Sequence, residues 1–147
     1  FCLSRGLGDV YKRQHPRANI IKMREGHPLN DEDRAPWLER IRDAAFSLER
    51  KSEVGIIICS ALKKKYRDLI REGNGNVKFL FLEGTFELVL ERMKQRKGHY
   101  MKTDMLKSQF ETLEVPGQDE PDVIHVDISG RFEQVVERCV EALKPLI

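Results

Sequence analysis

The sequence predicts an α/β protein in which a parallel β-sheet lies between two layers of helices. Three short segments are predicted to be strands, at residues 54–59, 77–82 and 123–128, and the first is a β-branched run without alternating polarity, which suits a central strand covered on both faces. Segments with helical periodicity separate these runs. Strands that alternate with helices are joined by right-handed crossovers, so the strands run parallel and ligands bind at their carboxyl ends.

Five segments carry apolar residues at helical spacing. The first begins in an acidic stretch that contains a proline, where free N–H groups favour anions and proline needs no donor. The second ends at Gly73, because glycine readily takes the left-handed conformation that terminates helices. The five segments span residues 31–48, 62–73, 86–93, 106–113 and 132–143.

The composition describes a single soluble domain with a heavily ionised surface. Of the 147 residues, 40% are hydrophobic and 34% are charged, and the net charge is only +2, so no overall field attracts nucleic acid or a membrane. The apolar runs are too short to span a bilayer. Three scattered cysteines form neither a disulfide framework nor a recognisable set of metal ligands. We therefore expect a cytoplasmic protein without nucleic-acid or membrane partners.

Residues 1–14 have neither helical nor strand periodicity, and they join abruptly to a strongly patterned sequence at His15. We interpret them as a disordered, non-native leader, and residues 15–147 as the native domain. A natural flexible terminus is the alternative.

One cationic stretch lies between Arg92 and Thr103 and contains no acidic residue. On a helix, Arg92 and Arg96 would share a face, and two guanidinium groups could then clamp phosphate oxygens. The alternative is a solvated helix end whose positive charges favour the helix dipole. The other basic residues of the stretch are Lys94, Lys97, His99 and Lys102.

A second cationic cluster opens the helix that follows the run at 54–59, and it contains Lys63, Lys64, Lys65 and Arg67. Because helix starts normally prefer acids, three successive lysines there suggest that an anion binds nearby. The alternative is that the lysines point into water around an ordinary Tyr66 anchor. His15, Lys22 and Arg34 are further polar candidates, although each alone is more often a surface residue than a ligand.

Five motifs resemble those of gluconokinases of the small P-loop kinase type, in the same order and with the same spacing. The resemblance covers residues 15–147. The motifs are HPRANIIKM at 15–23, GHPLNDEDRAPWL at 26–38, CSALKKKYR at 59–67, RKGHY at 96–100 and QFETLE at 109–114.

This resemblance implies the fold of adenylate and shikimate kinases, a five-stranded parallel sheet between helix layers, with a mobile lid at about 92–104 and a homodimer. Family members begin with a strand, a phosphate-binding loop, a helix and a second strand. That block does not occur here, and no Gly-x-x-x-x-Gly-Lys-Ser/Thr loop occurs anywhere in the chain. We therefore expect an N-terminally truncated chain that is inactive by itself.

In the intact enzyme, the resemblance implies transfer of the γ-phosphoryl group of ATP to the 6-hydroxyl of D-gluconate, with Mg²⁺ as the metal. Arg34, Lys63 and Arg67 would hold the gluconate anion. The hydroxyls would contact His15, Lys22 and Gln109. The groups assigned to catalysis are Lys63, Arg92 and Arg96, and those assigned to ATP are Arg92, Arg96, Lys97 and His99.

Two other functions fit the same residues. A small kinase with another acceptor, such as shikimate or a nucleoside monophosphate, would share the architecture. A non-catalytic domain could instead bind anions or a partner through its two cationic clusters.

Overall fold

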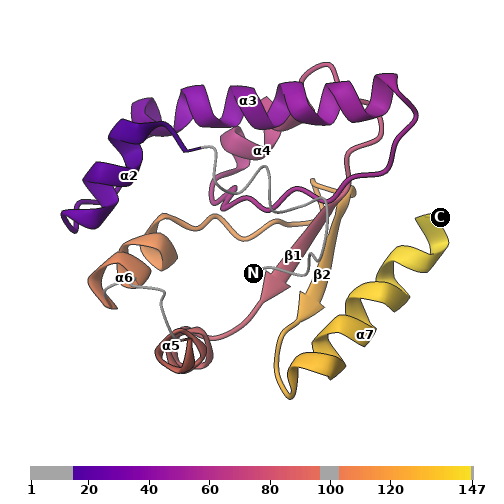
Figure 1. The fold of residues 1–147 in the computed structure, drawn as a ribbon. Coiled ribbons are helices and arrows are strands. Elements are labelled where there is room, and N and C mark those ends of the chain that lie inside the picture. The colour runs from indigo at the N-terminus through magenta and orange to yellow at the C-terminus, as the bar shows by residue number, and fades with distance from the viewer. Residues whose placement is uncertain (1–14, 97–102, 147) are drawn as a thin grey trace. The chain divides into compact units, whose positions relative to one another are not determined.

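The computed structural model describes residues 15–96 and 103–146, which form two compact units. Unit 1 extends to Val77 and includes Glu111–Val115, and unit 2 consists of Lys78–Phe110 and Pro116–Ile147. The chain therefore passes from unit 2 back into unit 1 inside helix α6. Figure 1 labels the helices and strands of both units.

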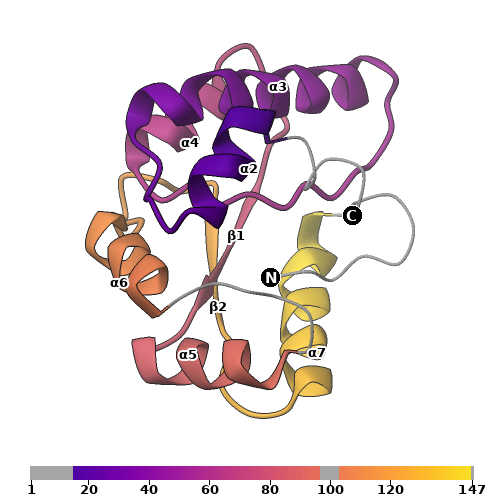
Figure 2. The same ribbon diagram turned by 60° about the vertical axis from the view of Figure 1, so that its left-hand side comes forward.

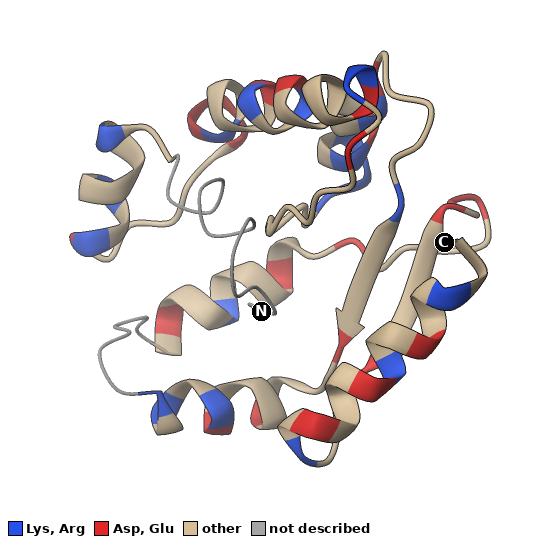
Figure 3. Cartoon of the chain, turned by 45° about the vertical axis from the view of Figure 1, so that its right-hand side comes forward, with Lys and Arg blue, Asp and Glu red and all other residues tan. Residues whose placement is uncertain are grey.

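Unit 1 contains helices α2 (Arg17–Arg24), α3 (Asp31–Arg50) and α4 (Lys64–Arg71). The predicted helices at 31–48 and 62–73 are confirmed. Helix α3 begins at a capping box, in which Asn30 Oδ1 accepts a hydrogen bond from Asp33 N and Asp33 Oδ2 accepts one from Asn30 N. Helix α3 carries both acidic and basic residues along its length (Figure 3). The buried apolar residues of the unit are Trp37, Leu38, Ile41, Tyr66 and Ile70.

The strand predicted at 54–59 is wrong, because this segment is neither helix nor strand. Val54 is 91% exposed and Ile56 is 54% exposed. β-branched residues favour an extended backbone, but a strand exists only where a neighbouring chain accepts and donates its hydrogen bonds. Within the described residues, the only strand pairing joins β1 and β2, which both belong to unit 2.

Unit 2 contains the two described strands, β1 (Phe79–Glu83) and β2 (Val123–Asp127). They pair in parallel, with Phe79 opposite Val123 and Glu83 opposite Asp127. The runs predicted at 77–82 and 123–128 are thus confirmed within two residues, as is the parallel direction of the sheet.

The helices of unit 2 are α5 (Phe86–Gln95), the first part of α6 (Thr103–Thr112) and α7 (Phe132–Leu143), which continues into the 3-10 turn η1 (Lys144–Leu146). Helix α7 lies along the sheet and contacts β2 (Figure 2), where it buries Val135 and Cys139. None of the helices in the described part of the chain is long and apolar enough to cross a membrane.

Candidate substrate-binding site

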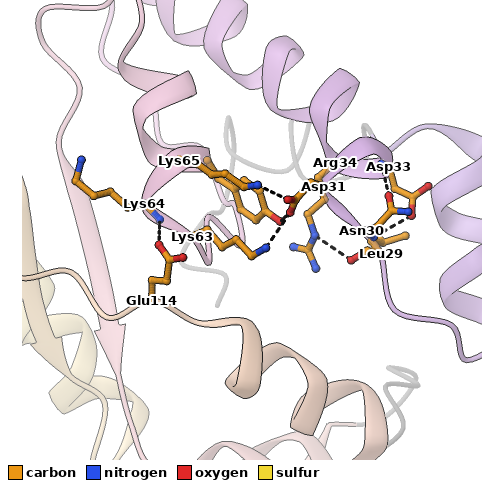
Figure 4. Close-up of polar contacts among 10 residues, drawn as sticks. Leu29, Asn30, Asp31, Asp33, Arg34, Lys63, Lys64, Lys65 and Glu114 are labelled. Atoms are coloured by element: carbon orange, nitrogen blue, oxygen red, sulfur yellow. Dashed lines mark hydrogen bonds and ion pairs between the residues drawn. The ribbon is translucent and has the colours of Figure 1, made fainter.

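The cationic cluster at the start of α4 is gathered around one carboxylate, that of Asp31 at the start of α3. Lys63 Nζ donates to Asp31 Oδ1 over 3.0 Å, and Lys65 Nζ and the Tyr66 hydroxyl also donate to this carboxylate (Figure 4). The hydrogen bonds from Lys65, Tyr66 and Lys63 hold the pKa of Asp31 well below its usual range. Burial and the bond to Asp31 raise the pKa of Tyr66 to about 12. Asp31 is therefore ionised and Tyr66 protonated at neutral pH.

Arg34, one helical turn beyond Asp31, adds a third cation to the same place. Its Cζ lies 5.5 Å from the centre of the Tyr66 ring, and the Nζ atoms of Lys63 and Lys65 lie 5.7 and 5.9 Å from it. Three cations and one carboxylate therefore surround a single ring, so the local charge is positive. We call Asp31, Arg34, Lys63, Lys65 and Tyr66 the Tyr66 cluster.

The guanidinium of Arg34 is buried, and within the described residues it forms no ion pair, although the charge of the neighbouring Asp33 acts on it. The residue is only 5% exposed, and the one hydrogen bond that its side chain makes within the described residues runs from Nε to the carbonyl oxygen of Leu29 over 3.5 Å, which is long. Burying a charge without a partner costs free energy, so the arrangement is understandable if an anionic ligand supplies the missing partner.

Arg67 is buried in a different way, with 3% exposure and several acceptors. Its Nη1 donates to the carbonyl oxygens of Ala61 and Leu62 over 2.9 and 3.2 Å, and its Nη2 donates to the carbonyl oxygen of Glu114 over 3.0 Å. These bonds join the loop before α4 to the segment 111–115. The direct contact of Arg67 with gluconate stays a prediction, and its hydrogen bonds favour a role in positioning the loop.

A carboxylate of the protein itself, that of Glu114, compensates the positive N-terminus of α4. Glu114 Oε2 accepts a hydrogen bond from the Lys64 backbone N–H over 2.8 Å, and the Glu114 N–H donates to the Leu62 carbonyl over 2.8 Å. The N-cap residue Lys63 makes no capping bond with its own side chain. The lysine run therefore does not by itself require a bound anion, because Glu114 and Asp31 already compensate the helix start.

His15 and Lys22, both predicted to contact substrate, lie beside the start of α3. The His15 ring stacks on Trp37 with a centroid distance of 4.0 Å, and its Nδ1 lies 3.4 Å from Asn19 Nδ2. Lys22 Nζ donates to Asp33 Oδ2 over 2.5 Å. Burial and the charge of Arg34 lower the pKa of His15 to about 4, so the imidazole is neutral at neutral pH and can both donate and accept hydrogen bonds.

The low pKa of His15 predicts a loss of stability in mild acid. An unfolded chain takes up this proton near pH 6.5, whereas the folded protein takes it up near pH 4. The unfolded state thus binds more protons between these values, and stability falls as the pH decreases from 6.5 to 4. Thermal unfolding over this range is expected to show that slope, and His15→Gln should reduce it.

Trp37 is the only tryptophan of the chain, so its fluorescence reports the stacked His15 directly. The protonated imidazole of His15 is expected to quench the Trp37 fluorescence, with a midpoint near pH 4. A midpoint near 6.5 would show that His15 is not held in this buried stack. The hydrogen bonds from Lys65 to Asp31 and from Lys22 to Asp33 lower the pKa values of these two carboxyl groups.

The predicted ATP-side residues belong to unit 2, and the structure changes one expectation about them. Arg92 lies on α5 and its Nη2 donates to the Gly130 carbonyl over 2.6 Å. Arg96 does not share a helical face with Arg92, because α5 ends at Gln95 and Arg96 has an extended backbone, with φ −80° and ψ 116°. Gln109 is half-buried on α6. Lys97, His99 and the rest of the segment 97–102 of the expected lid lie outside the described residues.

The loop after β2 receives the hydrogen bond from Arg92. Asp127 accepts hydrogen bonds from the backbone N–H and the hydroxyl of Ser129 over 2.9 and 2.6 Å. Arg138 Nη1 donates to the carbonyl oxygens of Asp127 and Ser129 over 2.8 and 2.7 Å. Gly130, with a positive φ of 85°, completes the turn. Hydrogen bonds from the guanidinium groups of Arg92 and Arg138 to backbone carbonyl oxygens thus stabilise the conformation of this loop.

Comparison with known proteins identifies the family. The chain is 55% identical over 130 residues to the thermoresistant gluconokinase of Escherichia coli K12, covering 88% of this chain and 74% of that protein. The chain belongs to the gluconokinase family. The thermosensitive gluconokinase of the same bacterium is 52% identical, covering 88% of this chain and 69% of that protein. No family model matches the chain.

Solved structures of gluconokinase-like proteins confirm the fold class. A sugar kinase from Janibacter sp. HTCC2649 superposes with a TM-score of 0.81 at 40% identity, over 93% of this chain and 77% of that one. A gluconokinase from Sinorhizobium meliloti 1021 gives 0.78 at 39% identity, over 95% and 75%. The fold is therefore the α/β fold of the small P-loop sugar kinases, and, as in other kinases, a nucleotide is the phosphoryl donor of the family.

Within the described residues of this gluconokinase-family chain, neither a phosphate-binding loop nor a cluster of metal ligands is present. The sequence contains no Gly-x-x-x-x-Gly-Lys-Ser/Thr loop, whose backbone N–H groups would cradle the phosphates. No group of three or more His, Cys, Asp or Glu side chains within residues 15–96 and 103–146 is arranged to hold a metal. What the described residues do provide is the positive Tyr66 cluster.

Proposed function

We propose that this chain binds D-gluconate for phosphorylation at its 6-hydroxyl by ATP. The observation that carries the proposal is the buried, unpaired guanidinium of Arg34 beside Lys63, in a chain of the gluconokinase family. A sugar acid presents one carboxylate and several hydroxyls. The carboxylate would be the missing partner of Arg34, through the paired N–H groups that a guanidinium offers to carboxylates.

Binding the acid at its carboxylate orients the rest of the molecule. Lys63 would add charge to the same contact, and His15 and Lys22 would contact hydroxyls, the first as a neutral donor and acceptor. Phosphoryl transfer depends mostly on positioning and on compensation of negative charge, which are the two properties of this cluster. We propose that Gln109 also contacts the hydroxyls of gluconate.

We further propose that Arg92 and Arg96, with Lys97 and His99, act on the ATP side. For Arg92 this requires that the guanidinium exchange the Gly130 carbonyl for a phosphate oxygen. ATP supplies the transferred group, and Mg²⁺ would accompany it. The resemblance and the composition support five further proposals. These are a homodimer, a lid at about 92–104, a cytoplasmic location, a native domain at 15–147 after a leader at 1–14, and the absence of nucleic-acid and membrane partners.

Isothermal titration calorimetry with D-gluconate tests the proposal. The 147-residue chain is expected to bind gluconate and to bind D-glucitol, the neutral polyol of the same length, at least about tenfold more weakly, because a charge-assisted hydrogen bond is lost. Shikimate is the matched anionic control and should also bind more weakly. ATP turnover by this chain is not expected, because the phosphate-binding loop is not in its sequence. Equal affinity for gluconate and glucitol would contradict the proposal.

A further inference from the structure

Asp31 is the common acceptor of the Tyr66 cluster, although it carries the same charge as the proposed ligand. Its carboxylate accepts hydrogen bonds from Lys63, Lys65 and the Tyr66 hydroxyl, all from the first turn of α4 or the residue before it. Asp31 itself lies at the first position of α3, three residues before Arg34. These contacts tie the first turn of α3 to the first turn of α4 (Figure 4).

The stability gained from these ion pairs is small, so their main consequence is geometric. The side chains of Asp31 and Lys65 are 42% and 58% exposed, and exposed ion pairs contribute little to folding. A free lysine, however, samples many rotamers, and ordering it on binding costs free energy. The shared carboxylate of Asp31 keeps both ammonium groups next to the Tyr66 hydroxyl before the ligand arrives. It also offsets the repulsion between three neighbouring cations.

We propose that Asp31 is a positioning residue that arranges Lys63, Lys65 and Tyr66 around Arg34 for the carboxylate of the substrate. This inference rests on the proposed function and deepens it. The rival explanation is that Asp31 occupies the place of the substrate carboxylate and competes with it. The two explanations predict opposite changes in affinity when the charge of Asp31 is removed.

The test is the affinity of the full 147-residue chain for D-gluconate after Asp31→Asn. Positioning predicts that binding weakens about tenfold, because the lysines lose their shared acceptor. Asp31→Glu keeps the charge and is expected to remain within about threefold of the unaltered chain. Asp68→Asn is the matched control, since Asp68 pairs with Lys64 and Arg71 outside the Tyr66 cluster, and it should leave the affinity unchanged.

A second readout separates positioning from a general loss of structure. The ¹⁵N ammonium signals of Lys63 and Lys65, assigned with Lys→Arg variants, should be visible in the unaltered chain and broaden in Asp31→Asn but not in Asp68→Asn. Unchanged or tighter gluconate binding by Asp31→Asn would overturn the inference and leave the proposed function standing. A chain that binds no gluconate before any substitution would overturn both.

Discussion

Arg34→Met is expected to abolish measurable gluconate binding without destabilising the fold. The guanidinium would make the main charge-assisted contacts with the substrate carboxylate, so its removal should weaken binding at least about 100-fold. In the absence of ligand, the buried charge has one long hydrogen bond and a cation–π contact with Tyr66 as its compensation. Methionine has a similar length and no charge to desolvate, so the melting temperature should stay the same or rise.

Arg42→Met is the matched control for this prediction. Arg42 lies on the same helix, but its ion pairs with Asp43 and Glu72 are on the surface. Its replacement should change neither the gluconate affinity nor the melting temperature, because exposed ion pairs contribute little to stability. Calorimetry and thermal unfolding of both variants measure the two quantities. If Arg34→Met lowered the melting temperature by as much as a buried structural arginine does, the burial of Arg34 would be explained by folding alone.

The elements that could be predicted from the sequence are those whose signal is local. The acidic first turn predicts helix α3, and the apolar stripe predicts helix α7. Helix α2 was not predicted, because its only buried residue is the polar Asn19, so no apolar stripe marks it. The run at 54–59 has the composition of a strand but no paired neighbour in the described chain. The composition of a segment indicates its preferred backbone conformation, but it does not show whether a neighbouring strand is present to pair with it.

For the candidate site as well, the sequence indicates individual residues but not the partners that they bind. Lys63 and Arg67 could be selected because they belong to an unusual cationic cluster at a helix start, and Arg34 could be selected through the resemblance of its motif. Their partners could not be selected. In the sequence, Asp31 is only one of the acids at a helix start, and it lies 32 to 35 residues from the groups it binds. Glu114 caps a helix 50 residues away. Nothing in the sequence distinguishes the unpaired Arg34 from the fully bonded Arg67.

Arg67→Met is expected to have the opposite effect on stability from Arg34→Met. Its hydrogen bonds to the carbonyls of Ala61, Leu62 and Glu114 lie in a place that is closed to water, since Arg67 is 3% exposed. Methionine would leave the carbonyls of Ala61 and Glu114 without the donor that Arg67 provides, at about 1 to 3 kcal/mol each. The Leu62 carbonyl would keep its hydrogen bond from the Glu114 N–H. A loss of about 3 kcal/mol or more in the free energy of unfolding follows, which corresponds to about 10 °C in melting temperature.

The control for this second prediction is Arg71→Met, one turn further along α4. The Arg71 side chain pairs with Asp68 at a more exposed position, so its loss should cost less than about 1 kcal/mol. Gluconate binding distinguishes the two buried arginines further. At a temperature where Arg67→Met is still folded, it should retain part of its affinity, because Arg34 keeps its charge, whereas Arg34→Met should retain none. Complete loss of binding in a folded Arg67→Met protein would instead place Arg67 in direct contact with the substrate, as its motif first suggested.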